Sequence, residues 1–126
     1  MKLESAAFGG EDALKLSPVL EGGTIRTTPL IREIFGNIGR LKIRDLAYSA
    51  QLYLARSLSA SAVQIAAKSG VESIGFTGGV ACNELITRSL EATVKKDGFR
   101  FLVHQSVPPG DGGLSFGQAV VAARAS

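Results

Sequence analysis

The sequence is poor in the residues that build disulfides, metal clusters and aromatic stacks. Its 126 residues include no tryptophan, one cysteine and one histidine, and aromatic residues make up 6%. Because Cys82 stands alone, an internal disulfide and a cysteine-based zinc cluster are excluded. Because His104 stands alone, a self-contained histidine metal site is excluded as well.

Long apolar runs and clustered charge are also missing. No uninterrupted run approaches the roughly 20 apolar residues of a membrane span. The first residues, MKLES, lack the apolar core of a signal peptide, so we expect a cytoplasmic protein with no membrane segment. The formal net charge is +3, but the only basic doublet is Lys95-Lys96. Because the basic residues are scattered and few aromatic residues are available for stacking, nucleic acid is disfavoured as a partner.

The sequence contains enough hydrophobic residues for one hydrophobic core. Hydrophobic residues make up 45% of the chain and charged residues 20%, which excludes global disorder. The length allows a single domain over residues 1–126 and disfavours two independent ones.

The first forty residues predict short elements. A helix over 1–7 ends at a glycine pair, and strands over 14–17 and 24–27 form a hairpin around a second glycine pair. Thr28 is the predicted N-cap of a helix over 30–38, with the proline that follows it at the first helical position.

The longest predicted element is a helix over residues 43–69. Small side chains fill residues 57–62, where we expect close packing against another backbone. Gly70 is suited to end the helix. One apolar stripe follows helical spacing: Ile43, Leu46, Ala47, Ala50, Leu54, Leu58 and Ile65.

The remainder alternates strands and helices. A buried strand over 71–76 is followed by a helix over 80–96, then a strand over 99–104 and a final helix over 114–124. In the helix over 80–96, inward-facing side chains are expected at Leu85, Ile86, Leu90 and Val94. This order predicts a parallel strand pair with a helical crossover. The expected fold is therefore α/β, with a small mixed sheet, an N-terminal hairpin and packed helices.

Each of these strands runs into a glycine loop, where open α/β sheets place their ligands. Gly78 and Gly79 let the backbone approach a phosphate, or they simply make a tight turn. Asn83 either caps the helix that follows or presents its amide to a ligand, and local capping is favoured. Packing is the expected role of Cys82, and a structural or solvent-facing role that of His104.

The second loop contains a carboxylate between glycines. Asp111 has two interpretations: an N-cap of the last helix, or a group that holds a divalent metal or orients phosphates. The capping preference favours the first interpretation. Gly112 and Gly113 leave room beside the carboxylate for either role.

Together the two loops resemble the C-terminal end of the HypF family of carbamoyltransferases. The resemblance rests on GGVACNEL at 78–85 and PPGDGGLSFGQA at 108–119, with support from MKLESAA at 1–7 and TTPL at 27–30. GGVACN is also similar to the TsaD family, which modifies tRNA adenosine with threonylcarbamoyl groups.

The resemblance implies one lobe of an actin/Hsp70/sugar-kinase-like (ribonuclease H-like) fold that binds ATP between two lobes. HypF proteins form a carbamoyl adenylate from ATP and carbamoyl phosphate and carbamoylate the C-terminal cysteine of HypE, a step in the maturation of nickel–iron hydrogenases. By this resemblance Asp111 holds a divalent metal together with histidines outside this chain. The residues implied to contact the nucleotide are Gly78, Gly79, Asn83, Gly112 and Gly113.

The sequence also departs from the family. The histidines of the first lobe and the acylphosphatase-like, zinc-finger and YrdC-like domains are absent, and Tyr48, Gln51 and Tyr53 lie where the family has a Phe-His pair. We therefore expect the second lobe alone, inactive by itself and pairing with a first lobe or with itself. The alternatives are a non-catalytic nucleotide-binding or assembly module and a TsaD-like component.

Overall fold

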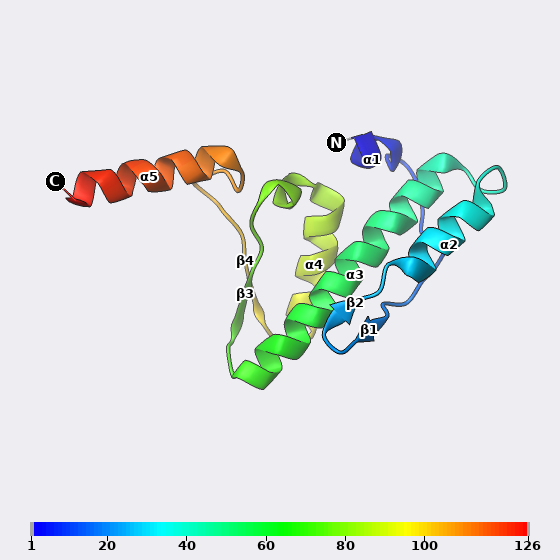
Figure 1. Cartoon of the computed structure of the whole chain (residues 1–126), viewed down its shortest axis with the longest axis horizontal. Helices are drawn as coiled ribbons and strands as arrows, with labels where there is room; N and C mark the ends of the chain where they lie inside the picture. Colours follow the sequence, from blue (N-terminus) through cyan, green and yellow to red (C-terminus); the bar gives the residue numbers. More distant parts are fainter. Residues whose placement is uncertain (1, 126) are drawn as a thin grey trace.

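The computed structural model describes residues 2–125, and the predicted alternation of helices and strands is confirmed (Figure 1). Met1, which begins the predicted first helix, lies outside the described residues. The elements in chain order are α1 (Lys2–Ala6), β1 (Leu20–Glu21), β2 (Thr24–Ile25), α2 (Thr28–Asn37), α3 (Ile43–Ser69), β3 (Ser73–Gly75), the 3-10 helix η1 (Gly79–Cys82), α4 (Glu84–Lys96), β4 (Arg100–Leu102) and α5 (Asp111–Ala125).

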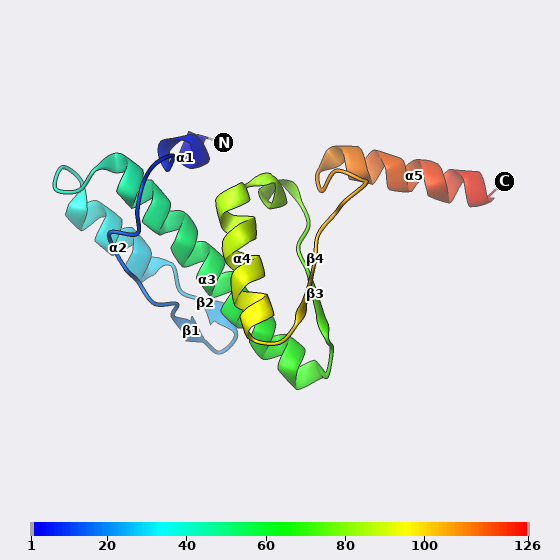
Figure 2. The same cartoon turned by 180° about the vertical axis from the view of Figure 1, so that it is seen from behind.

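Helix α3 is the axis of the molecule and has the predicted bounds. Gly70, with φ of +67°, follows its last residue as expected. Helices α1 and α2 pack on one side of α3, while α4 and the β3–β4 sheet lie on the other (Figures 1 and 2). A helix enclosed on both sides needs apolar or small side chains around most of its circumference.

Two small hydrophobic clusters form the core, one on each side of α3. Leu30, Ala50 and Tyr53 are buried between α2 and α3. Across the helix, Ala55 of α3 is buried with Ile86 and Leu90 of α4, and half-buried aromatic side chains of the β3–β4 region pack against them. The close packing expected over residues 57–62 is confirmed at Ser57 and Ser59, which are fully buried, whereas Leu58 is 40% exposed.

The single apolar stripe predicted for α3 is only partly correct. Leu46, Ala47 and Ala50 are buried, but Ile43 is 77% exposed and Ile65 is 61% exposed. The burial is instead spread around the helix, because neighbours approach it from two directions and cover polar positions as well. The polar residues buried on α3 are Asp45, Ser49, Gln51, Ser57 and Ser59.

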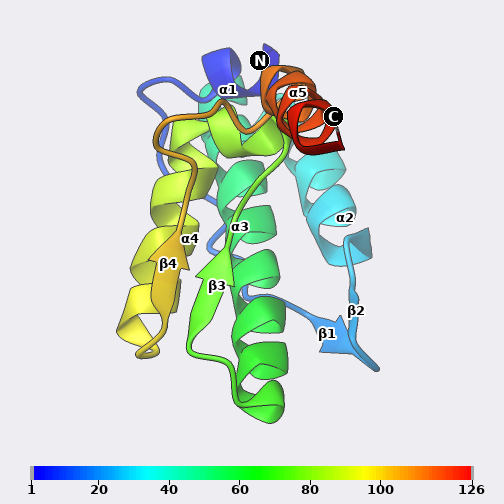
Figure 3. The same ribbon diagram turned by 90° about the vertical axis from the view of Figure 1, so that its left-hand side faces the viewer.

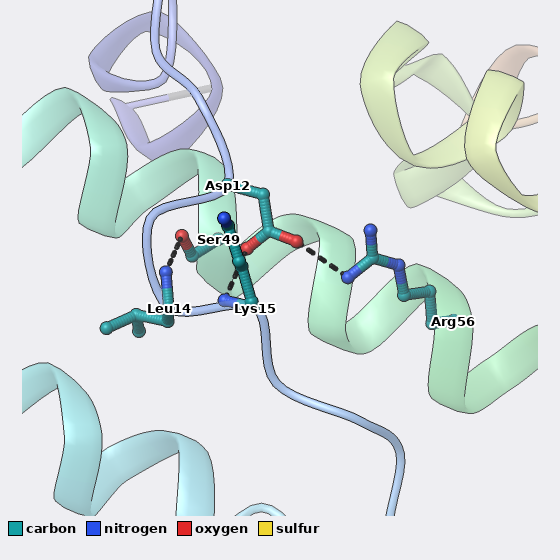
Figure 4. Close-up of polar contacts among 5 residues, drawn as sticks. All are labelled: Asp12, Leu14, Lys15, Ser49 and Arg56. Carbon is teal, nitrogen blue, oxygen red and sulfur yellow. Dashed lines mark hydrogen bonds and ion pairs between the residues drawn. The ribbon is translucent and has the colours of Figure 1, made fainter.

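The strand predicted over residues 14–17 is wrong, because side chains occupy the backbone donors that a strand would use. The Leu14 N–H donates to Ser49 Oγ at 3.1 Å, and the Lys15 N–H donates to Asp12 Oδ1 at 3.0 Å (Figure 4). The second carboxylate oxygen of Asp12 accepts from Arg56 Nη1 at 2.7 Å. This segment is thus anchored on α3 by side chains.

The hairpin itself exists, but its first strand is β1, just before the predicted glycine turn. Leu20 pairs with Ile25 and Glu21 with Thr24 in antiparallel register. Helix α2 begins one residue earlier than expected, with Thr27 as its N-cap and Thr28 as its first residue.

Strands β3 and β4 form the predicted parallel pair, joined by α4 (Figure 3). Ile74 lies opposite Phe101 in the register. The expectation of a buried strand over 71–76 is wrong, because Ser73 and Ile74 are only half-buried and Gly75 is exposed. In the described residues this sheet has two strands, too few to enclose either one.

The helix predicted over 80–96 is divided into η1 and α4, with Asn83 between them. Ile86, Leu90 and Val94 are buried as predicted, and Leu85 is half-buried. Helix α5 projects away from the rest of the molecule (Figures 1 and 2). Within residues 2–125, no helix is both long and apolar enough to cross a membrane.

We expect Leu90→Ala to lower the free energy of unfolding by about 2–5 kcal/mol, because it leaves a cavity between α3 and α4. Leu90 is 4% exposed, whereas Leu114 of α5 is 66% exposed and provides a helical control. Leu114→Ala is expected to change stability by less than about 0.5 kcal/mol. Urea unfolding of the three proteins measures the difference, and equal losses in the two variants would contradict this assignment of the core.

Candidate functional site

The loops that follow β3 and β4 meet at one end of the small sheet. The Gly78 N–H donates to the Pro109 carbonyl oxygen at 2.9 Å, and Thr77 Oγ1 lies 2.7 Å from His104 Nε2. The Phe76 N–H, which donates to the Leu102 carbonyl, extends the pairing of the strands toward these contacts. The two glycine loops singled out in the sequence are therefore neighbours in space, as parallel strands require.

Beside these contacts lies a shallow, open depression of about 300 Å³. It follows the last residues of both strands and the first residues of both loops. Its lining residues are Gly75, Phe76, Thr77, Leu102, Val103 and His104. The carboxyl ends of parallel strands are where α/β proteins bind ligands, so this end of the sheet is the candidate site.

The first loop depends on glycine at position 78. Gly78 has φ of +94° and ψ of 175°, a combination that an L side chain rarely adopts. This conformation directs the chain from β3 into η1 while its N–H reaches Pro109. Gly79, by contrast, has open space where a Cβ would be, so its lack of a side chain is not required by its protein neighbours.

In the second loop, glycine allows the backbone to fold tightly onto itself. A Cβ on Gly113 would lie 2.3 Å from the carbonyl oxygen of Pro108, and one on Gly112 would lie 2.9 Å from Pro108 Cγ. The Gly113 N–H donates to the Gly110 carbonyl at 2.9 Å, which closes the turn into α5. The site is thus built from two backbone turns that side chains would disturb.

Asp111 is exposed and is the first residue of α5, one position inside the helix rather than before it. A carboxylate in the first helical turn still complements the helix dipole. Among residues 2–125, no group of three or more His, Cys, Asp or Glu side chains could hold a metal ion. Asp111 therefore offers a single carboxylate, and a complete metal site would need its other ligands from water, a bound phosphate or another polypeptide segment.

Asn83 caps α4, as the sequence analysis favoured. Its Oδ1 accepts a hydrogen bond from the Ile86 N–H at 3.0 Å, and its Nδ2 donates to Gln51 Oε1 at 2.6 Å. Both ends of the side-chain amide are thus engaged by protein groups. The nucleotide contact implied by resemblance for this residue stays a prediction.

Gln51, which the sequence marked only as lying where the family has a Phe-His pair, is hydrogen-bonded to Asn83 behind the first loop. It lies on α3 with 1% exposure, far from either loop in the sequence. The signal available was an amide side chain among apolar residues of a long helix, because a buried polar group must find hydrogen-bond partners. Which partners it finds depends on the packing of α3 against α4.

The lone cysteine and the lone histidine differ in outcome. Cys82, expected to pack in the interior, is exposed, because η1 turns the chain outward before α4 begins. His104 is also exposed and is hydrogen-bonded to Thr77, which confirms the structural or solvent-facing role expected for it.

Comparison with known proteins identifies the family. Residues 1–118 match the family described as "Carbamoyltransferase, Kae1-like Domain, second subdomain". The chain belongs to the HypF-type carbamoyltransferases. The probable carbamoyltransferase HypF of Methanocaldococcus jannaschii is 37% identical over 121 residues, which make up 95% of this chain and 16% of that protein.

Solved structures agree with this assignment. The crystal structure of Thermococcus kodakarensis HypF superposes with a TM-score of 0.83 at 42% identity, over 96% of this chain and 16% of that one. A full-length HypF crystallised in a phosphate- and nucleotide-bound form gives a TM-score of 0.79 over the same shares, and its 22% identity shows the shared fold. The expected α/β lobe is thus confirmed, and the chain spans about one-sixth of the HypF proteins it matches.

A tRNA N6-adenosine threonylcarbamoyltransferase of Thermococcus kodakarensis is 29% identical over 112 residues, covering 87% of this chain and 33% of that protein. The similarity to the TsaD family noted in the sequence is therefore also found over most of the chain.

We expect Gly113→Ala to loosen the loop before α5, because the new Cβ would overlap the Pro108 carbonyl. Strain of this kind costs on the order of 1–3 kcal/mol. Gly117→Ala is the matched control, since nothing lies within 4 Å of its Cβ position and alanine favours a helix. Relative to the intrinsic rate of the residue present, hydrogen exchange at the amide of position 113 should speed up in the first variant and stay unchanged in the second. Equal exchange in both variants would refute the close approach.

Proposed function

We propose that this chain forms the second lobe of the ATP-binding domain of a HypF-type carbamoyltransferase. In that role it helps bind the ATP that, with carbamoyl phosphate, gives a carbamoyl adenylate, and the carbamoyl group then passes to HypE. The observation that carries the proposal is the hydrogen bond from the Gly78 N–H to the Pro109 carbonyl, which joins the two family motifs at one end of the sheet.

The chemistry of the joined loops supports a phosphate ligand. Gly79 is exposed and begins η1, so a phosphate can approach its backbone without meeting a side chain. Gly112 and Gly113 follow Asp111 in the first turn of α5, and the role proposed for the carboxylate is to hold a divalent cation that accompanies the nucleotide. A nucleotide between these loops would contact Gly78, Gly79, Asn83, Gly112 and Gly113.

This lobe supplies only part of such a site. The depression is open, and Asp111 lacks the further ligands that a metal ion needs among the described residues. Catalysis of group transfer requires both reactants to be held in place and water to be excluded. We therefore assign turnover to the lobe together with a first lobe, and none to the lobe alone.

Helix α5 is the natural contact for that first lobe. It projects from the body (Figures 1 and 2). Its exposed apolar side chains include Leu114, Phe116 and Val121. An exposed apolar surface of this kind favours association. Its proposed partner is the first lobe, or a second copy of this chain where no first lobe is present.

A chimera provides the direct test, with this chain replacing the corresponding segment of Thermococcus kodakarensis HypF, to which it is 42% identical. We expect calorimetry with ATP and Mg²⁺ to detect binding by the chimera and no heat with the isolated chain. Carbamoyl transfer is expected in the chimera alone. Turnover by the isolated chain, or a folded chimera that fails to bind ATP, would refute the proposal.

In the same chimera, we expect Gly79→Ala to weaken ATP binding by roughly tenfold, because a methyl group would stand where the nucleotide approaches the backbone. The protein itself leaves space for that methyl group, so the fold should be unchanged. Gly36→Ala in α2 is the control, with equally open surroundings away from the site. Unchanged ATP affinity in Gly79→Ala would remove this loop from the nucleotide site.

The two alternatives make different predictions for the chimera. A non-catalytic binding or assembly module would bind ATP without transferring the carbamoyl group. A TsaD-like component would instead support threonylcarbamoyl transfer to tRNA. The 29% identity with the Thermococcus kodakarensis tRNA enzyme supports this hypothesis less than the 37% identity with HypF supports the first.

A further inference from the structure

We propose that Gln51 is a positioning residue for the Gly78–Asn83 loop: it fixes, through Asn83, where the proposed nucleotide loop stands relative to α1 and α3. The inference rests on the proposed function for its link to ATP, but the positioning itself concerns residues within this chain. Gln51 touches neither the depression nor the glycines, so its effect on them is indirect.

Both the nitrogen and the oxygen of the Gln51 side-chain amide are hydrogen-bonded. Its Nε2 donates to the Leu3 carbonyl at 3.0 Å and to the Ala47 carbonyl at 3.2 Å. Its Oε1 accepts from Asn83 Nδ2 at 2.6 Å. Because Gln51 is 1% exposed, water cannot take over these bonds, and the side chain is held in one orientation.

Asn83 transmits this placement to the loop. Its backbone N–H donates to the Val80 carbonyl at 2.9 Å within η1, and its Oδ1 receives the Ile86 N–H at the start of α4. Asn83 is thus bonded to η1, to α4 and to α3 at once. Moving its side chain would move the junction of η1 and α4, and with it the short 3-10 turn that begins at Gly79.

A second contact runs parallel to the first. Glu4 Oε1 accepts a hydrogen bond from the Glu84 N–H at 3.2 Å, so α1 contacts the start of α4 directly as well as through Gln51. The two acceptors are neighbours on α1: the Leu3 carbonyl accepts from Gln51, and the Glu4 carboxylate accepts from Glu84. The N-terminal helix therefore supports the loop even though it lies almost 80 residues away in the sequence.

The test is amide hydrogen exchange on the chain itself, which needs no ligand. In Gln51→Leu, exchange at the Gly78 and Asn83 amides should accelerate roughly 5- to 30-fold. The reference is exchange at the amides of Leu90 and Val94 in the core. A factor of this size corresponds to the loss of one or two hydrogen bonds' worth of local stability. Global destabilisation alone would accelerate all four amides together.

Asn83→Ser separates positioning from capping. Serine is an equally good N-cap but lacks the amide donor to Gln51. We expect the same selective acceleration in the loop with α4 intact. The effects should be less than additive in the double variant, since both changes remove the same Gln51–Asn83 hydrogen bond. Ser57→Ala is the control: Ser57 is buried on the same helix, and its hydroxyl has no hydrogen-bond partner among the described residues. It should leave the loop amides unchanged.

Uniform acceleration in Gln51→Leu, or no loop effect in Asn83→Ser, would overturn the proposal. In the HypF chimera, Gln51→Leu should also weaken ATP binding several-fold while Ser57→Ala does not. If the unmodified chimera binds no ATP, the proposed function fails and the exchange experiment alone decides the role of Gln51. If it binds ATP and the loop responds without a change in affinity, positioning of the nucleotide loop is refuted.

Discussion

Helix α3 is enclosed by α1 and α2 on one side and by α4 with a two-stranded sheet on the other, so its side chains must pack against neighbours in two directions. Apolar and small residues do this where α2 and α4 press against the helix, as at Ala50 and Ala55. Two of the buried polar residues on α3 anchor other segments: Ser49 binds the backbone at Leu14, and Gln51 binds Leu3 and Asn83. The other elements are placed by their contacts with this helix.

The candidate site shows the same dependence at a smaller scale. Gly78 and Gly113 provide turns that no other residue could make without strain or overlap, so the two loops can approach within one backbone hydrogen bond of each other. The position of that pair relative to the body is set by Asn83 and, behind it, Gln51. A site made of backbone groups has few side chains to adjust it, and its geometry therefore depends on what supports the loops.

Much of this was predictable from the sequence, for local reasons. The bounds of α3, the parallel pair of β3 and β4 and the capping role of Asn83 follow from periodicity, alternation and capping chemistry. The errors arose where packing overrides local pattern. Residues 14–17 alternate like a strand, yet the side chains of Ser49 and Asp12 take their backbone donors. Cys82 looks like a core residue, but η1 turns it to the surface.

The family and the two motif loops follow from the amino-acid sequence alone, because glycine, proline and aspartate at fixed spacing impose turns whatever surrounds them. The sequence has one histidine and one cysteine, too few for a metal site built from either residue type alone. Only the tertiary structure decided that Gly78 meets Pro109 and that Gln51 supports Asn83. Those contacts join residues about 30 apart in the chain, and the hydrogen bonds exist because α3, α4 and the sheet pack together.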